Sequence, residues 1–110
     1  MPKQKLISAA LLPLVLCVAA RAQPPAASKQ PSASAGQQIF VQKCMQCHSV
    51  NKDQVLLGPS LWGEMTKSPH KKTAAQIRVI IKNGKGKMPP WGTMLSEQDI
   101  DNVLAYLHSL

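Results

Sequence analysis

The sequence predicts an all-α domain with three main helices joined by irregular loops. Three segments, which begin at Ser34, Thr73 and Ser96, carry apolar side chains at helical spacing. The stretches between them are interrupted by glycine and proline, which seldom continue regular structure. No segment alternates strictly between polar and apolar residues as a half-buried strand does, and the chain contains no internal repeat.

The first helix is expected to run from Ser34 to about His48. Ser34 and Gln37 fit a capping box, in which the serine hydroxyl and the glutamine side chain satisfy N–H groups at a helix start. Ile39 and Phe40 then begin the apolar face, so this helix should pack against the rest of the domain from its first turns onward.

The second helix is expected over residues 73–83. Its three isoleucines, Ile77, Ile80 and Ile81, lie at positions i, i+3 and i+4 and therefore share one face. Gly84 follows directly, and glycine after the last periodic residue is a common helix stop.

The last helix is expected to begin at Ser96, because residues 84–93 contain too many glycines and prolines for regular structure. Ser96 is a favoured N-cap residue, and Glu97 and Asp99 place negative charge in the first turn. The buried stripe of this helix should consist of Ile100, Val103, Leu104 and Leu107.

Residues 1–22 have the organisation of a secretory signal peptide: two lysines, an apolar stretch over 6–20, and a small-x-small cleavage sequence that ends at Ala22. The apolar stretch is shorter than the roughly 20 residues that a spanning helix needs. We therefore expect cleavage after Ala22, export to the periplasm or another compartment outside the cytoplasm, and no spanning segment in the mature chain. A retained anchor and lipidation at Cys17 are the alternatives.

Residues 23–33 are rich in proline, alanine, serine and glutamine, which predicts a disordered linker. Residues 34–110 then form one small domain, which we expect to be a monomer. The formal net charge of the whole chain is +8. A basic chain can bind nucleic acid, but the predicted export and the lack of a nucleic-acid-binding motif argue against that function.

The pentapeptide Cys44-Met45-Gln46-Cys47-His48 reads C-x-x-C-H, the attachment sequence for covalently bound haem. Two thiols on one helical turn can each add to a vinyl group of the porphyrin, and His48 then lies under the ring as an iron ligand. A zinc site would need further ligands, and a thioredoxin-like dithiol would need a βαβ context. The motif therefore predicts one haem c, attached through Cys44 and Cys47.

Met88 is the favoured second iron ligand. It follows a glycine-rich loop that lets the backbone approach the haem, and Pro89 forces it into an extended conformation. A stiff loop can keep a weak thioether on the iron. Met65 and Met94 fit the ordinary role of flexible core filler, and Met45 lies between the two cysteines, where it cannot turn to the iron. The alternative ligands are His70, beside a proline in a polar loop, and His108, in the last helical turn.

Five short patterns occur in one order over most of the predicted domain: Gly36-x-x-x-Phe40, Cys44-x-x-Cys47-His48, Gly58-Pro59-x-Leu61, Gly86-Lys87-Met88-Pro89 and Leu104-x-Tyr106-Leu107. In these patterns the chain resembles the small class I c-type cytochromes. The resemblance implies a small cytochrome c-like fold wrapped around one covalently bound haem. It implies that the Pro59 carbonyl accepts a hydrogen bond from His48, and that Gly36 and Phe40 meet Tyr106 where the first and last helices cross.

Two groups of lysines admit two interpretations. One group flanks Met88 and the other precedes the second helix; they are Lys82, Lys85 and Lys87, and Lys67, Lys71 and Lys72. Such runs are commonly a solvated face, or they form a positive ring around an exposed haem edge that attracts acidic redox partners. Trp62 and Trp91 also have two interpretations: each can line the haem crevice, or it can simply pack in the core or on the surface.

A haem iron held by His48 and Met88 has no open position, which favours one-electron transfer over catalysis. We therefore expect an electron carrier, not an enzyme, that shuttles electrons between periplasmic or membrane redox partners. One alternative is a cytochrome subunit of a dehydrogenase or oxidase complex. The other is a haem peroxidase or gas-binding protein, which would require Met88 to be absent from the iron.

Overall fold

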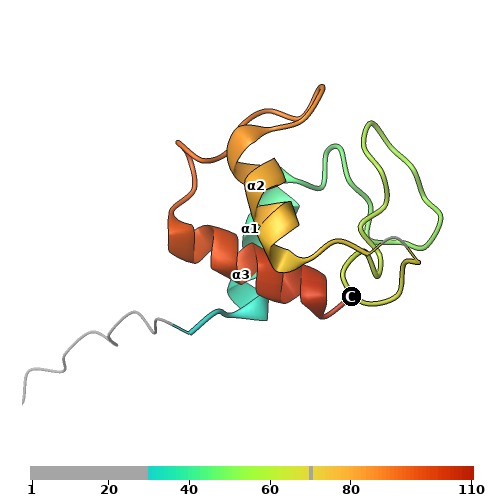
Figure 1. The fold of residues 1–110 in the computed structure, drawn as a ribbon, viewed down its shortest axis with the longest axis horizontal. Coiled ribbons are helices and arrows are strands. Elements are labelled where there is room, and N and C mark those ends of the chain that lie inside the picture. Colours follow the sequence, from blue (N-terminus) through green and yellow to red (C-terminus); the bar gives the residue numbers. More distant parts are fainter. Residues whose placement is uncertain (1–29, 70) are drawn as a thin grey trace, which may run out of the picture.

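The computed structural model describes residues 30–69 and 71–110, and within them it contains three helices: α1 (Ala33–Lys43), α2 (Ala74–Asn83) and α3 (Glu97–His108). In the view of Figure 1, α1 passes behind α3, α2 lies above α3 and in front of the upper part of α1, and the loops between α1 and α2 fill one side of the molecule. The prediction of a three-helix, all-α domain is confirmed.

The signal peptide over 1–22 and most of the linker over 23–33 lie outside the described residues, as does His70. Within 30–69 and 71–110, no helix is long and apolar enough to cross a bilayer.

The first helix begins earlier than its capping pattern predicts. Its N-cap is Ser32, whose hydroxyl accepts a hydrogen bond from the Ala35 N–H at 3.3 Å. The Ser32 N–H in turn donates to the side-chain carbonyl of Asn102 on α3 at 2.8 Å. The expected start at Ser34 is therefore wrong, because a contact with the last helix fixes the cap two residues upstream.

A close crossing joins α1 to α3. A methyl group at Gly36 would overlap the backbone carbonyl of Asn102, so only glycine permits this approach. Phe40 is 2% exposed, and its ring lies 5.4 Å from the ring of Tyr106 at an interplanar angle of 58°. This tilted geometry is favourable for aromatic pairs. The packing roles that the resemblance implies for these residues are confirmed.

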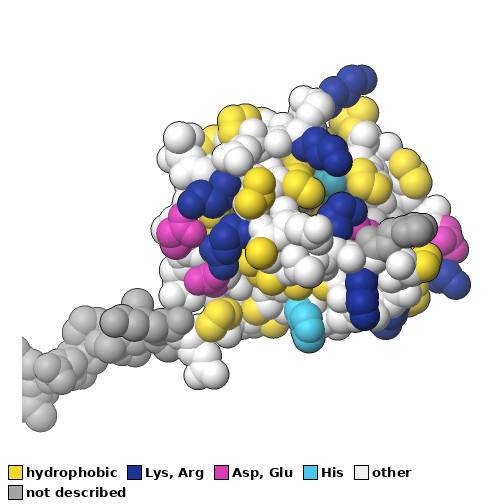
Figure 2. Space-filling model, viewed as in Figure 1, with side chains coloured by type: hydrophobic (Ala, Val, Ile, Leu, Met, Phe, Trp, Pro, Cys, Tyr) yellow, Lys and Arg dark blue, Asp and Glu magenta, His cyan; other side chains and the backbone are white. Residues whose placement is uncertain are grey.

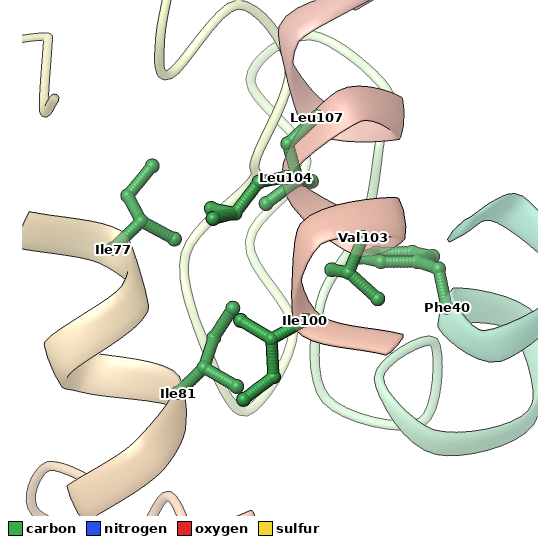
Figure 3. Packing of buried hydrophobic residues seen from close by; sticks show 7 residues of the cluster. All are labelled: Phe40, Ile77, Ile81, Ile100, Val103, Leu104 and Leu107. Carbon is green, nitrogen blue, oxygen red and sulfur yellow. The ribbon is translucent and has the colours of Figure 1, made fainter. Parts of the chain in front are cut away.

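The buried core gathers side chains from all three helices onto α3 (Figure 3). The predicted stripe of α3 is buried throughout, whereas Ile80 of α2 is only half-buried. The core consists of Phe40, Ile77, Ile81, Ile100, Val103, Leu104 and Leu107. Partly buried residues that extend it include Cys44, Met88 and Trp91. The small core therefore continues into the predicted cofactor site.

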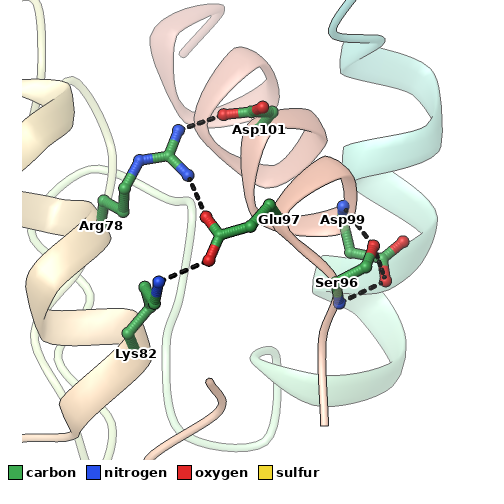
Figure 4. Close-up of polar contacts among 6 residues, drawn as sticks. All are labelled: Arg78, Lys82, Ser96, Glu97, Asp99 and Asp101. Carbon is green, nitrogen blue, oxygen red and sulfur yellow. Dashed lines mark hydrogen bonds and ion pairs between the residues drawn. The ribbon is translucent and has the colours of Figure 1, made fainter. Parts of the chain in front are cut away.

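Ion pairs align α2 with α3 on the surface (Figure 4). The Arg78 guanidinium bonds Asp101 and lies 3.1 Å from Glu97, and Lys82 also bonds Glu97. Hydrogen bonding to Asp101 raises the pKa of Arg78, and the bond from Lys82 lowers the pKa of Glu97. Partly exposed pairs of this kind contribute little to the free energy of unfolding.

The start of α3 is closed by a reciprocal capping box, as the sequence predicts. The Ser96 hydroxyl accepts from the Asp99 N–H at 3.0 Å, and the Asp99 carboxylate accepts from the Ser96 N–H at 2.9 Å. The Ser96 hydroxyl also donates to the Asp99 carboxylate at 2.7 Å, and this bond, together with the weaker effect of the bond from the Ser96 N–H, lowers the pKa of Asp99 below its usual 3.8.

Replacing either capping residue should destabilise the domain in a way that depends on pH. Ser96→Ala should lower the free energy of unfolding by about 1 kcal/mol at pH 7. Because the folded pKa of Asp99 lies below its unfolded value, its charge contributes fully above about pH 4, and the contribution is lost as pH falls through the folded pKa. Urea unfolding of Asp99→Asn should therefore differ from wild type at pH 7 and converge on it below pH 3. Equal losses at both pH values would contradict this reasoning.

Candidate haem-binding site

The C-x-x-C-H motif forms a separate turn after α1. The helix ends at Lys43 with Cys44 as its C-cap, so the expected extension to His48 is wrong. The chain nevertheless closes one more helical turn, in which the Cys47 and His48 N–H groups donate to the Cys44 carbonyl at 3.1 and 3.0 Å. The two thiols and the imidazole therefore lie together at the end of α1.

Cys44 and Cys47 form no disulfide with each other, and both are half-buried. Burial, and then the proximity of Cys47, raises the pKa of Cys44 to about 11. A redox-active dithiol needs a lowered pKa so that one sulfur attacks as a thiolate. In the described part of the chain, no cluster of three or more histidine, cysteine or acidic side chains could hold a metal ion. Neither alternative for the cysteine pair is therefore supported.

His48 is held in one orientation by the loop that follows it. Its Nδ1 lies 2.9 Å from the Pro59 carbonyl oxygen, which can only accept, so Nδ1 carries the proton and donates. The other ring nitrogen, Nε2, is then unprotonated and available to a metal. This is the contact that the resemblance implies.

Gly58 lets the loop lie directly against the imidazole. A methyl group at this position would be 2.5 Å from His48 Cε1 and 2.8 Å from Nδ1. The Gly58 N–H also donates to the Cys47 carbonyl at 2.7 Å, which ties the loop back to the motif. The Gly58-Pro59 pair therefore leaves room for the ring and supplies its acceptor.

Residues 84–92 form a tight strap after α2. Gly84 ends the helix with φ of +74°, as predicted, and a side chain there would come 2.5 Å from the Met88 carbonyl. Lys85 and Met88 exchange backbone hydrogen bonds of 3.1 and 3.0 Å across the turn. Further along, the Trp91 N–H donates to the Ile81 carbonyl at 2.9 Å, which anchors the strap to α2.

Met88 is half-buried and packs against the hydrophobic core. Its thioether therefore stands on a strap that is anchored at both ends. Met94 is 64% exposed beyond the strap. His108 is exposed in the last turn of α3. Of the candidates for a second iron ligand within the described residues, Met88 has the rigid, partly buried setting that a weak ligand needs.

The two tryptophans differ in their surroundings. Trp62 is 37% exposed, and its ring lies 4.5 Å from the Lys67 ammonium and 5.7 Å from that of Lys52. These are cation–π distances, so Trp62 is a surface residue. Trp91 is half-buried and packs against the core within the strap.

The six lysines of the two predicted groups are not equivalent. Lys72 pairs with Glu64, and Lys82 pairs with Glu97. Lys67 donates to the Leu110 backbone oxygen. The remaining three, Lys71, Lys85 and Lys87, are exposed and form no ion pair within residues 30–69 and 71–110. Figure 2 shows lysine and hydrophobic side chains interspersed over one face of the molecule.

Sequence reasoning missed Ser49, which follows the motif histidine. It is the buried polar residue of the described chain, at 6% exposure, and it holds the loop that carries Pro59. No local pattern distinguishes a serine of this kind from a solvated one. The signal that identifies Ser49 is its burial next to His48, and burial emerges only from the folded structure.

The residues present fit a covalently attached haem. Two cysteine sulfurs that form no disulfide and an imidazole with its Nε2 available lie on one turn, and glycines at 58 and 84 provide space beside the imidazole and within the strap. The partly buried apolar residues that extend the core include Cys44, Met88 and Trp91, so apolar surface of the kind that a porphyrin needs lies at the site.

Comparisons with known proteins agree with this fit. Residues 31–107 match a family model described as cytochrome c oxidase, cbb3-type, subunit III. Cytochrome c6 of Gracilaria tenuistipitata var. liui is 32% identical over 73 residues, which are 66% of this chain and 68% of the relative. Cytochrome c6 of Diacronema lutheri is 33% identical over 75 residues, which are 67% of this chain and 90% of the relative.

A solved structure shares the fold. Cytochrome c6 from the diatom Phaeodactylum tricornutum aligns with a TM-score of 0.58 and 32% identity, and the alignment covers 71% of this chain and 92% of the diatom chain. A three-helix domain with a C-x-x-C-H turn and a methionine strap defines a small c-type cytochrome. The chain belongs to the cytochrome c family, as a class I monohaem protein of the type that the cbb3 subunit III model describes. Its cofactor is covalent haem c, and its class is that of electron-transfer proteins rather than enzymes.

Proposed function

We propose that this protein carries single electrons between redox partners, with His48 and Met88 as the two iron ligands and Cys44 and Cys47 as the points of haem attachment. The observation that carries the proposal is the 2.9 Å contact between His48 Nδ1 and the Pro59 carbonyl. It fixes the tautomer and leaves Nε2 for the iron.

The protein contributes rigidity on both sides of the cofactor. When bound, the haem supplies a reversible one-electron couple. His48 is held by the Gly58-Pro59 loop, and Met88 stands on a strap that hydrogen-bonds back to α2. Ligands that move little between oxidation states keep the reorganisation small, and occupation of both faces leaves no position for a substrate.

A redox and optical titration of the purified holoprotein tests this function. We expect one reversible one-electron transition, with a spectrum of sulfur-ligated haem, and no binding of carbon monoxide to the reduced protein at neutral pH. Ready binding of carbon monoxide would show an open iron and would favour a peroxidase or gas-binding protein instead.

A second function, that of a cytochrome subunit, is favoured by one observation. The family model that matches residues 31–107 is named for a subunit of an oxidase. Co-purification of this chain from its native membrane fraction with a larger redox complex would support the subunit. Recovery of the holoprotein alone, as a monomer, would support the free carrier.

We further propose that the protein acts outside the cytoplasm, in the periplasm or an equivalent compartment. The support is the pattern of residues 1–22, with cleavage after Ala22. The linker over 23–33 would then join the new N-terminus to a domain over 34–110, whose ordered part extends back to the cap at Ser32.

The exposed lysines of the strap, Lys85 and Lys87, are proposed to attract acidic redox partners. Exposed charges are screened over about 8–10 Å at moderate ionic strength, so association should slow as salt rises. Replacing both lysines with glutamate should reduce the association rate at low salt by at least about tenfold. Stopped-flow electron transfer to an acidic redox protein measures both effects.

The matched control changes net charge equally outside the strap, by Lys43→Glu with Lys52→Glu. If both double variants slow association alike, net charge alone accounts for the effect and the strap has no special role. Association that does not depend on salt would refute electrostatic attraction altogether.

A further inference from the structure

Ser49 closes the loop that begins immediately after His48. Its hydroxyl donates to Gln54 Oε1 at 2.7 Å and accepts from the Asn51 N–H at 2.9 Å. Its backbone carbonyl accepts from the Leu61 N–H at 2.8 Å. One residue therefore joins the start of the loop both to its middle and to its end.

Gln54 completes the arrangement on the opposite side of the loop. Its Oε1 also accepts from the Asn51 side-chain amide at 2.7 Å, and the Ser60 hydroxyl donates to the Asn51 carbonyl at 2.7 Å. The chain reverses at Asp53, which has a positive φ of 60°. We refer to Ser49, Asn51, Gln54 and Ser60 as the loop clasp.

The loop clasp encloses the residues that hold the imidazole. Pro59, whose carbonyl accepts from His48, lies between Gly58 and the clasp residue Ser60. Pro59 has no N–H with which to anchor itself, so the position of its carbonyl depends on its neighbours. These neighbours are tied to the Cys47 carbonyl on one side and to the clasp on the other.

We propose that Ser49 and Gln54 are positioning residues for the axial histidine. They hold the Pro59 carbonyl in place and so set the strength of the hydrogen bond that His48 Nδ1–H donates to it. The strength of this bond in turn sets the reduction potential of the haem. This inference rests on the proposed function, because it takes His48 as an iron ligand. A strong bond at Nδ1 makes the imidazole a more basic ligand and so favours the ferric state. The clasp therefore holds the potential down.

The direction in which the reduction potential changes in a variant distinguishes a positioning role from a purely structural one. If the clasp is loosened, the Pro59 carbonyl moves away, the ligand becomes less basic, and the potential rises. If a variant merely loosens the fold, water reaches the site, favours the more highly charged ferric state, and lowers the potential. The two explanations thus predict opposite shifts.

The test measures two quantities in the holoproteins of four variants: the reduction potential of the haem and, by NMR, the exchange rate of the His48 Nδ1 proton. Ser49→Ala and Gln54→Ala should each shift the ferrous-to-ferric ratio at a fixed applied potential a few-fold toward ferrous, and each should speed the proton exchange. Ser49→Thr, which keeps the hydroxyl, should remain close to wild type. Ser109→Ala is the matched control, because its hydroxyl also bonds a carbonyl but lies at the far end of α3.

Gln54 is exposed, so its variant should fold even if Ser49→Ala does not. An unchanged or lowered potential in Gln54→Ala, with exchange as slow as in the control, would overturn the inference. If wild type itself showed no histidine-ligated haem, the proposed function would fail and the inference with it. If the wild-type haem is ligated by histidine but the variants have the wild-type potential, the inference is wrong and the proposed function still stands.

Discussion

Met88→Ala is expected to lower the midpoint potential of the holoprotein by on the order of 0.1 V, within the roughly 0.8 V range that axial ligands span. A thioether favours the ferrous state, so its removal favours the ferric state. The vacated position should also let carbon monoxide bind the reduced variant at neutral pH. Spectroelectrochemistry and carbon monoxide titration measure the two effects.

Met94→Ala is the matched control for this variant. Met94 lies just beyond the strap and is 64% exposed, so its loss should leave both the potential and the exclusion of carbon monoxide unchanged. An unaltered potential in Met88→Ala would reject Met88 as the ligand and would reopen the question of which side chain occupies that face.

Gly36→Ala is expected to have the largest effect on stability. In an isolated helix this substitution would stabilise by up to about 1 kcal/mol. Here the added methyl would overlap the Asn102 carbonyl on α3. The two helices must then separate around Phe40, and overpacking of this kind costs about 2–3 kcal/mol. Urea unfolding of the holoprotein measures the loss.

The control for Gly36→Ala lies on the same helix. Ser34 is exposed and its hydroxyl hydrogen-bonds the exposed cap hydroxyl of Ser32 at 3.1 Å, so Ser34→Ala should change stability by no more than a few tenths of a kcal/mol. If Gly36→Ala were as stable as Ser34→Ala, the close crossing of α1 and α3 would not exist in solution.

The helices could be predicted from sequence because their signals are local. Ile77 and Ile81 share a face through helical spacing alone, and Ser96 with Asp99 forms a capping box within four residues. The start of α1 could not be predicted in this way. Ser32 and Ser34 are both capping residues, and Asn102, 70 residues away from Ser32, decides between them.

The candidate site was predictable to the extent that its groups are adjacent in sequence. The thiols and imidazole occupy five consecutive residues, and Met88 is marked by its glycines and Pro89. The loop clasp was not predictable, since Ser49 meets Gln54 only after the chain reverses at Asp53. The pattern of charges in the sequence also does not indicate which lysines form ion pairs with acidic side chains.

Covalent attachment of one haem through Cys44 and Cys47 is tested most directly by intact mass and thiol alkylation of the exported protein. We expect the mass of the processed polypeptide plus one haem, with no thiol available to the alkylating reagent. A colourless polypeptide in which both cysteines are alkylated would contradict haem attachment and the electron-carrier function derived from it.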